Sequence, residues 1–244
     1  MRAIFFSSVA HELRTPLNSI IPMIRMILDT MSHTIDGRVQ NYLQIILNAA
    51  LHLQNVIEDA LDMSRLENNK FSIYKEMSSI KRAVEEVCSL MNFQLNSKGL
   101  TLDLDINPQV PSQALIDLKR YKQVLFNLMG NASKFTFKGG ISLKVEFQHN
   151  NLISSVKDTG IGIKKEDLNK LFRFFGCIAK SKNINRGGMG LGLTISKMII
   201  QQLDGAINVE SLPNQGSNFT FRIPITEYFY EAEGASPNVS QLLI

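Results

Sequence analysis

The sequence predicts an α+β fold, in which a long helical hairpin precedes a two-layer α/β sandwich. Over the first 67 residues, apolar side chains recur every three or four positions, which is the spacing of one helix face. Later segments alternate apolar and polar residues with period two, as half-buried strands do, at residues 100–106, 141–147 and 152–156. Helical patterns lie between these segments, so helices should cover one face of a mixed sheet.

The first two helices are expected to form an antiparallel pair. The first helix should end at about Asp29, and the second should run from about Arg38 to Glu67. Between them, residues 30–37 are rich in Ser, Thr, Asp and Gly, which is typical of a turn. We therefore assign residues 1–70 to a helical hairpin.

The second domain is assigned to residues 71–226. Its helices are expected at about 79–97, 118–135 and 193–203, and its last strands at 206–210 and 218–223. Residues 227–244 contain Glu, Ser, Pro and Gly without a period, which predicts a flexible tail.

The apolar stripe of the hairpin is wider than one partner helix can cover. A second copy of the chain would cover it by forming a four-helix bundle, so we expect a homodimer. The open alternative is that the hairpin packs against its own C-terminal domain.

Composition excludes several classes of protein. The formal net charge is +4, but Lys and Arg are scattered and do not alternate with aromatic residues, so nucleic acid is not an expected partner. Cys88 and Cys177 lie far apart without metal-ligand spacing, which favours a reducing cytoplasm over a disulfide framework or a zinc site. No apolar run approaches the roughly 18 residues of a membrane span, so no membrane segment is expected in this chain.

Four motifs carry chemistry, and they occur in a fixed order. A helical His-Glu pair comes first, followed by an Asn-rich helix, an Asp-x-Gly-x-Gly turn and a glycine loop, at residues 8–18, 127–136, 158–162 and 187–193. His11 is the one histidine beside a carboxylate, and most imidazoles are unprotonated and nucleophilic near pH 7. Asn127, Asn131 and Lys134 are spaced four and three apart, so they share one helix face.

Together these motifs resemble the sensor histidine kinases of two-component signalling, over about residues 5–226. The resemblance implies that His11 accepts a phosphoryl group from ATP and that Glu12 takes the imidazole proton. It also implies that Thr15, one turn further on, places water for dephosphorylation. The phosphoryl group would then pass to an aspartate on a receiver domain, the response regulator, which is a separate partner here.

The same resemblance implies a site for ATP and Mg²⁺ in residues 71–226. Asn131 would supply a side-chain oxygen to Mg²⁺, with Asn127 and Lys134 within reach of the phosphates. Asp158 would accept a hydrogen bond from the adenine amino group, with Gly160 and Gly162 letting the backbone approach the ring. The remaining expected contacts are Gly188, Gly190, Leu191 and Gly192 at a helix N-terminus that suits phosphates, and Thr220 as the hydroxyl residue of the last strand.

Two features depart from the family pattern. Met189 stands where the glycine loop usually has Thr, which removes a hydroxyl that could hold the lid formed by residues 171–186. The chain also begins only ten residues before His11. We therefore expect either a fragment, such as the cytoplasmic core of a membrane-bound or hybrid kinase, or a kinase without an input domain.

Two alternatives remain open. The related ATPases of topoisomerases, mismatch-repair proteins and heat-shock chaperones share the nucleotide fold, but they use a Glu four residues before the magnesium Asn to activate water. Asn127 occupies that position here and is a poor base. The second alternative is a signalling scaffold that binds nucleotide with weak catalysis. The presence of His11 on the expected dimerisation helix favours transfer to protein.

Overall fold

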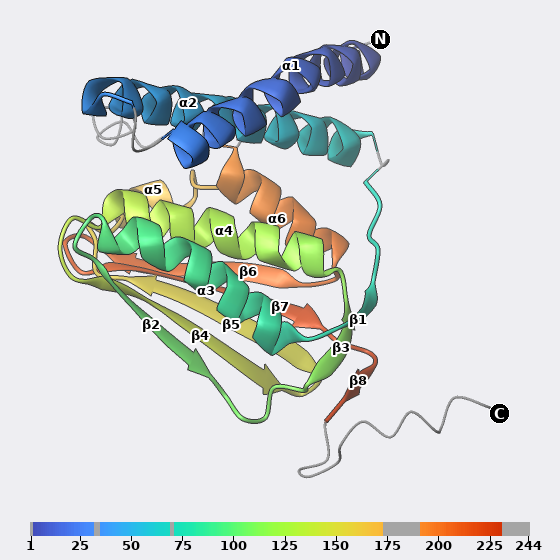
Figure 1. Ribbon diagram of the computed structural model, residues 1–244. Coiled ribbons are helices and arrows are strands. Elements are labelled where there is room, and N and C mark those ends of the chain that lie inside the picture. The colour runs from blue at the N-terminus through green and yellow to red at the C-terminus, as the bar shows by residue number, and fades with distance from the viewer. Residues whose placement is uncertain (1, 32–34, 69–70, 173–190, 231–244) are drawn as a thin grey trace, which may run out of the picture.

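The computed structural model describes residues 2–31, 35–68, 71–172 and 191–230. Helices α1 (Arg2–Met31) and α2 (Gly37–Glu67) lie side by side as an antiparallel hairpin. Figure 1 shows this hairpin stacked over a layer of helices, which in turn covers one face of a sheet. The expected hairpin followed by a two-layer α/β domain is confirmed.

The hairpin holds a small core of its own. Apolar residues at helical spacing face each other across the pair, namely Leu17, Ile21 and Ile24 from α1 with Leu47, Ala50, Ile57 and Leu61 from α2. Pro16 and Pro22 both lie inside α1. None of the helices within the described ranges is long and apolar enough to cross a membrane.

The second domain is built on a five-stranded sheet with the order β2-β4-β5-β7-β6. Strands β2 and β4 are parallel, and the other neighbours are antiparallel. The strands are β2 (Thr101–Ile106), β4 (Gly140–Gln148), β5 (Asn151–Asp158), β6 (Ala206–Leu212) and β7 (Gly216–Pro224). Their alternating burial places every second side chain against the helices and leaves the opposite face more exposed.

The helices over this sheet are α3 (Ile80–Asn96), α4 (Leu118–Phe135) and α6 (Gly192–Gln202), with a short α5 (Lys165–Leu168) beside them (Figure 1). Ser79 and Asp117 begin α3 and α4, since each side chain accepts a hydrogen bond from a backbone N–H of the first turn. Tyr121, Leu125 and Leu128 of α4 are fully buried against the sheet, so α4 is the central helix of the domain core.

A second, three-stranded sheet was not predicted from the sequence. It consists of β1 (Glu76–Ser78), β3 (Gln113–Ile116) and β8 (Tyr228–Phe229), in the order β1-β3-β8. The expected tail therefore does not begin at residue 227, because Tyr228 and Phe229 pair with β3. The Tyr228 ring also packs edge-on against Phe147, with 4.9 Å between ring centroids.

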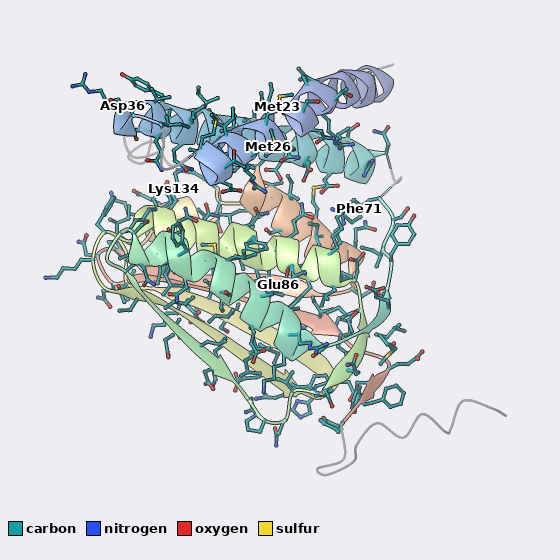
Figure 2. The ribbon with its side chains drawn as sticks, in the orientation of Figure 1. Met23, Met26, Asp36, Phe71, Glu86 and Lys134 are labelled. Atoms are coloured by element: carbon teal, nitrogen blue, oxygen red, sulfur yellow. The ribbon has the colours of Figure 1, made fainter. Side chains whose placement is uncertain are left out.

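The hairpin contacts the domain that follows it. Helix α2 packs against α6, and Met63 of α2 and Phe71 of the linker lie against the domain core. Figure 2 shows Phe71 at the opposite end of α4 from Lys134. The hairpin therefore does pack against its own domain, and a large part of its apolar surface still remains exposed.

One carboxylate of α2 makes stability depend on pH. The pKa of Asp59 is raised to about 6 by burial and by the neighbouring carboxylates of Asp62 and Glu58. The folded pKa lies above the unfolded value of about 3.9, so ionised Asp59 destabilises the folded protein above pH 6. This penalty shrinks as the pH falls through 6 toward 4.

We predict that Asp59→Asn stabilises the protein at pH 7.5 by about 1–2 kcal/mol, because it removes the buried charge without changing the shape. Thermal unfolding followed by circular dichroism should show a higher midpoint at pH 7.5 and almost no difference at pH 4. Asp103→Asn, a change at an exposed carboxylate on β2, is the control. An equal gain at both pH values would contradict the assignment of the penalty to Asp59 ionisation.

Candidate functional site

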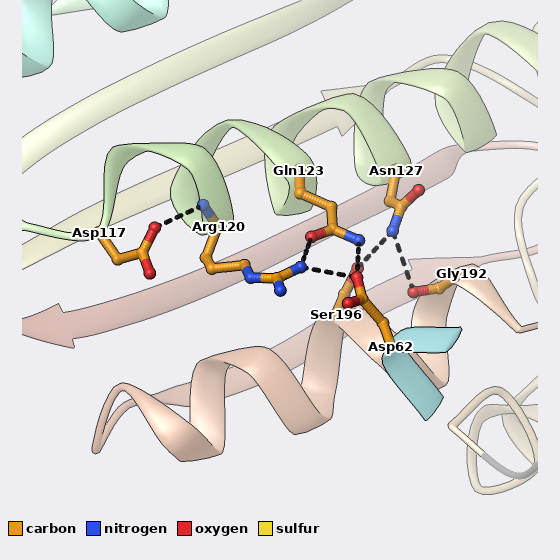
Figure 3. Close-up of polar contacts among 7 residues, drawn as sticks. All are labelled: Asp62, Asp117, Arg120, Gln123, Asn127, Gly192 and Ser196. Atoms are coloured by element: carbon orange, nitrogen blue, oxygen red, sulfur yellow. Dashed lines mark hydrogen bonds and ion pairs between the residues drawn. The ribbon is translucent and has the colours of Figure 1, made fainter. Parts of the chain in front are cut away.

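The polar face of α4 carries three of the predicted site residues. Asn127, Asn131 and Lys134 are half-buried on this helix, and the spacing places them on one stripe opposite the core face. The Asn127 amide nitrogen donates to the Gly192 carbonyl at 3.4 Å and lies 3.3 Å from the Ser196 hydroxyl, and both partners are on α6 (Figure 3). The stripe is thus held against the start of α6.

Asp158 ends β5 and lies at the edge of the core. It is only 5% exposed, and its carboxylate accepts hydrogen bonds from the Gly160 N–H, at 2.8 Å, and from Ser217. Burial raises the pKa of Asp158, and these hydrogen bonds partly oppose the rise. A buried carboxylate with spare acceptor capacity suits an uncharged N–H donor such as a heterocyclic amine.

The two glycines after Asp158 are required by the protein's own backbone. A Cβ at Gly160 would collide with the Phe135 carbonyl oxygen, and one at Gly162 would collide with the Leu212 carbonyl oxygen. Gly162 also has a φ of +63°, a region that favours glycine. The Ile161 N–H donates to the Phe135 carbonyl at 3.1 Å, so this turn is fastened to the end of α4.

The last strand contributes a hydroxyl different from the expected one. Thr220 points to the sheet face away from the helices, where its hydroxyl is 2.9 Å from that of Ser155. Ser217 lies on the helix side, is buried, and bonds to Asp158. The structure therefore does not bring Thr220 to the site. Side chains alternate between the two faces of a strand, and Thr220 is on the face opposite to that of Ser217.

The start of α6 presents the N-terminus of a helix to the same region. Leu191 is the N-cap residue and makes no side-chain capping hydrogen bond, and Gly192 is the first residue of the helix. The first turn of a helix has free N–H groups and a positive dipole end, which together attract anions such as phosphates. Leu191 itself is buried, so its side chain anchors the helix start in the core.

A buried hydroxyl that sequence reasoning missed lies beside the turn. Thr136 follows α4 directly and is 2% exposed, and its Oγ1 has no hydrogen-bond partner within the part of the chain that the structure describes. Buried polar groups nearly always have a partner, so this hydroxyl is an unusual feature beside the turn. The pattern Lys134-Phe135-Thr136 at the end of a helix was the available sequence signal.

The phosphoacceptor segment lies on α1. The backbones of His11 and Glu12 are helical, and their side chains lie outside the described residues, as do Gly188, Met189, Gly190 and most of the expected lid. Thr15 is on α1 one turn after His11 and is exposed. Of the expected lid, Leu171 and Phe172 are described. Leu171 is buried in the core, and Phe172 packs partly buried against it with Lys197 Nζ 5.5 Å from its ring centre.

Together, these residues form two ends of one site. A buried acceptor and tight glycine turns lie at the end of β5, and two amides, a lysine and a helix N-terminus come from α4 and α6. The first group suits a planar heterocycle and the second suits phosphates. The arrangement therefore fits a nucleotide. Within the described ranges, no group of three or more His, Cys, Asp or Glu side chains could hold a metal ion.

Comparison with known families identifies both parts of the chain. Residues 116–227 match the family model for the histidine kinase-, DNA gyrase B- and HSP90-like ATPases. Residues 1–69 match the His Kinase A (phospho-acceptor) domain. These two models lie over the domain that holds the nucleotide-type site and over the helical hairpin, respectively.

Curated relatives match along almost the whole chain. The signal transduction histidine-protein kinase BarA of Escherichia coli K12 is 36% identical over 224 residues, which is 90% of this chain and 24% of BarA. The aerobic respiration control sensor protein ArcB of the same strain is 31% identical over 233 residues, covering 95% of this chain and 30% of ArcB. The chain thus spans about a quarter of the length of these relatives.

Solved structures agree with this assignment. Full-length ShkA in complex with AMPPNP has a TM-score of 0.73 at 27% identity and covers 93% of this chain and 46% of that one. The Acinetobacter baumannii histidine kinase AdeS has a TM-score of 0.59 at 26% identity, covering 89% of this chain and 98% of AdeS. With the phosphoacceptor hairpin and the ATPase-type domain in one polypeptide, the chain belongs to the sensor histidine kinases.

Proposed function

We propose that this chain is an ATP-dependent protein-histidine kinase, which phosphorylates His11 and passes the phosphoryl group to an aspartate of a receiver domain. The main support is that one chain joins a nucleotide-type site, built from Asp158, the α4 stripe and the α6 N-terminus, to a phosphoacceptor hairpin. Among the relatives named above, BarA is a signal transduction histidine-protein kinase and AdeS is a histidine kinase.

In this proposal, each end of the site has its own task. Asp158 accepts a hydrogen bond from the adenine amino group, and Ser217, rather than Thr220, supports that carboxylate. The phosphates lie at the α6 N-terminus, with Lys134 and Asn127 nearby. Asn131 would hold Mg²⁺ through its amide oxygen, which is a hard ligand of the kind this ion prefers. Bound Mg²⁺ would neutralise charge on the phosphate oxygens.

The transfer step conserves atoms and charge. A ring nitrogen of neutral His11 attacks the γ-phosphorus in line, the bond to the bridging oxygen breaks, and ADP leaves with the electron pair. Glu12 accepts the proton that the phosphorylated imidazole loses. In a separate hydrolytic reaction, Thr15 would place a water molecule for removal of the phosphoryl group as inorganic phosphate. The phosphohistidine then donates to the receiver aspartate.

Hydrolysis of ATP is less well supported. The position that would carry a general base is Asn127, and its amide is engaged by the Gly192 carbonyl and the Ser196 hydroxyl on α6. An amide has no titratable lone pair near neutral pH, so it cannot take a proton from water.

The exposed face of the hairpin supports a homodimer. Large apolar side chains remain exposed along both helices, namely Leu13, Ile20, Met23 and Met31 of α1 and Tyr42, Ile46 and Leu53 of α2. A second hairpin packed on this face would bury them in a four-helix bundle. Use of ATP and the free buried thiol of Cys88 fit a cytoplasmic location.

We predict that Asp158→Asn weakens ATP binding by about 10- to 100-fold, because it removes a charged hydrogen-bond acceptor for the adenine amino group. Calorimetric titration with the nonhydrolysable analogue AMPPNP measures this change. Ser217→Ala should weaken binding less, by about 3- to 10-fold, since it removes a neutral hydroxyl. Thr220→Ala is the matched control on the same strand. If Thr220→Ala weakened binding more than Ser217→Ala, the assignment of the pocket face would be wrong.

We predict that incubation with γ-labelled ATP and Mg²⁺ gives label that is acid-labile and base-stable, as expected for a phosphorylated imidazole nitrogen. The label should be lost in His11→Gln, which removes the acceptor, and in Asn131→Asp, which alters the metal and phosphate site. His149→Gln serves as the control, because it changes a distant histidine in the β4–β5 turn. Label that persists in His11→Gln would overturn the assignment of the acceptor.

We predict that Ile46→Glu shifts the chain from dimer to monomer at micromolar concentration, because a charge on the apolar face cannot be buried in the bundle. Sedimentation equilibrium measures the mass. Lys81→Glu, an exposed change on α3 away from the hairpin, should leave the mass unchanged. A monomeric unmodified protein would rule out the bundle.

A further inference from the structure

A buried ion pair joins the hairpin to the nucleotide-binding helix. Arg120 Nη1 of α4 lies 2.6 Å from Asp62 Oδ2 of α2, and the two residues are 9% and 6% exposed. Gln123 of α4 bridges the pair: its amide nitrogen donates to the same carboxylate oxygen at 2.9 Å, and its amide oxygen accepts from Arg120 Nη1 at 2.7 Å (Figure 3). The three side chains form a closed set of contacts.

The linker between the two parts meets the same end of α4. The Arg120 guanidinium lies 4.2 Å above the ring centre of Phe71, which is close enough for a cation–π contact. The Asp117 carboxylate, which begins α4, also accepts from the Tyr74 N–H at 2.8 Å. Helix α2 and the linker therefore both hold the first turns of α4.

The contact with the hairpin uses the same stripe of α4 as the nucleotide-type site. Arg120 and Gln123 precede Asn127 by seven and four residues, so all three residues project from one side of the helix. In Figure 3 they follow one another along α4 from Asp117 toward the start of α6. The hairpin thus occupies one end of the stripe, and the proposed nucleotide occupies the other.

The Asp62–Arg120 ion pair is better suited to a contact that separates and re-forms than to a permanent one. Two charges taken from water lose hydration that their mutual attraction barely replaces, so a buried ion pair adds little net stability while fixing one geometry. When the pair separates, both charges are hydrated again, whereas separated apolar surfaces regain nothing from water. An ionic contact at a domain boundary can therefore specify one orientation and still release it.

We propose that Asp62, Arg120 and Gln123 form a latch, which parks the catalytic domain on α2 and must open before the γ-phosphate reaches His11. The ion pair and the cation–π contact that hold the first turns of α4 come from α2 and the linker, whereas His11 lies on α1. The latch rests on the proposed kinase function for its effect on rate. Its effect on domain position does not depend on that function.

The first test opens the latch. Asp62→Asn removes the charge and keeps the shape, so the catalytic domain should detach more often from α2. Small-angle X-ray scattering of the full chain at pH 8 should show a larger radius of gyration. Phosphorylation of His11 at saturating ATP should be about 3- to 10-fold faster, while the affinity for AMPPNP stays within twofold of the unmodified protein.

The second test closes the latch with apolar groups. The double variant Asp62→Leu, Arg120→Met replaces the ion pair by side chains that pack against each other and against Phe71, and such replacements usually keep a protein folded. This contact does not gain hydration on opening, so the domain should stay parked. The radius of gyration should match that of the unmodified protein, and His11 phosphorylation should be about 3- to 10-fold slower. Opposite effects of two changes at Asp62 distinguish a latch from a damaged fold.

A matched control lies on the same helix. Lys122 of α4 forms an ion pair with Glu86 of α3 at 3.0 Å, entirely within the catalytic domain. Figure 2 shows Glu86 on the helix that lies away from the hairpin. Glu86→Gln should change neither the radius of gyration nor the rate.

The outcomes separate the latch from the kinase function. If scattering changes as expected but no variant or parent protein labels His11, the latch stands and the kinase proposal fails. If Asp62→Asn leaves the radius of gyration unchanged, or slows phosphorylation at unchanged AMPPNP affinity, the latch is overturned. If Asp62→Asn does not fold, the double variant decides: a rate equal to or above that of the parent protein overturns the proposal.

Discussion

The site depends on the orientation of α4 about its own axis, which the core packing of this helix fixes. Tyr121, Leu125, Leu128 and Met129 are fully buried on its core side, and each such side chain contributes about 1.5–3 kcal/mol when removed from water. This burial leaves the helix little freedom to turn. The opposite side must then present Asn127, Asn131 and Lys134 together, so packing in the core determines where the polar groups of the site point.

The long elements could be predicted from the sequence because their apolar period is sustained over many residues. The helix expected at 118–135 has those bounds in the structure, and those expected at 79–97 and 193–203 shift by a single residue at each end. Strands β1, β3 and β8 have four residues or fewer, too few to show a period of two. They exist because they pair with one another across distant parts of the chain, which local sequence does not reveal.

The candidate site shows the same division. Asp158 and the α4 asparagines occur in short sequence motifs, so they could be predicted as site residues from the sequence alone. The choice between Ser217 and Thr220 depended on which face of β7 meets the helices, and an uncertainty of one residue in strand register reverses that answer. The Asp62–Arg120 pair spans two elements 58 positions apart, and no spacing rule links them. Tertiary packing alone created it.

The small sheet β1-β3-β8 has a mechanical consequence. It places the strand by which the chain enters the ATP-binding domain only one strand away from the strand by which it leaves (Figure 1). The first strand of the domain, β1, and its last strand, β8, therefore both lie near the linker. When the nucleotide domain rotates about the linker, Tyr230 should therefore travel a shorter path than the distant nucleotide-type site does.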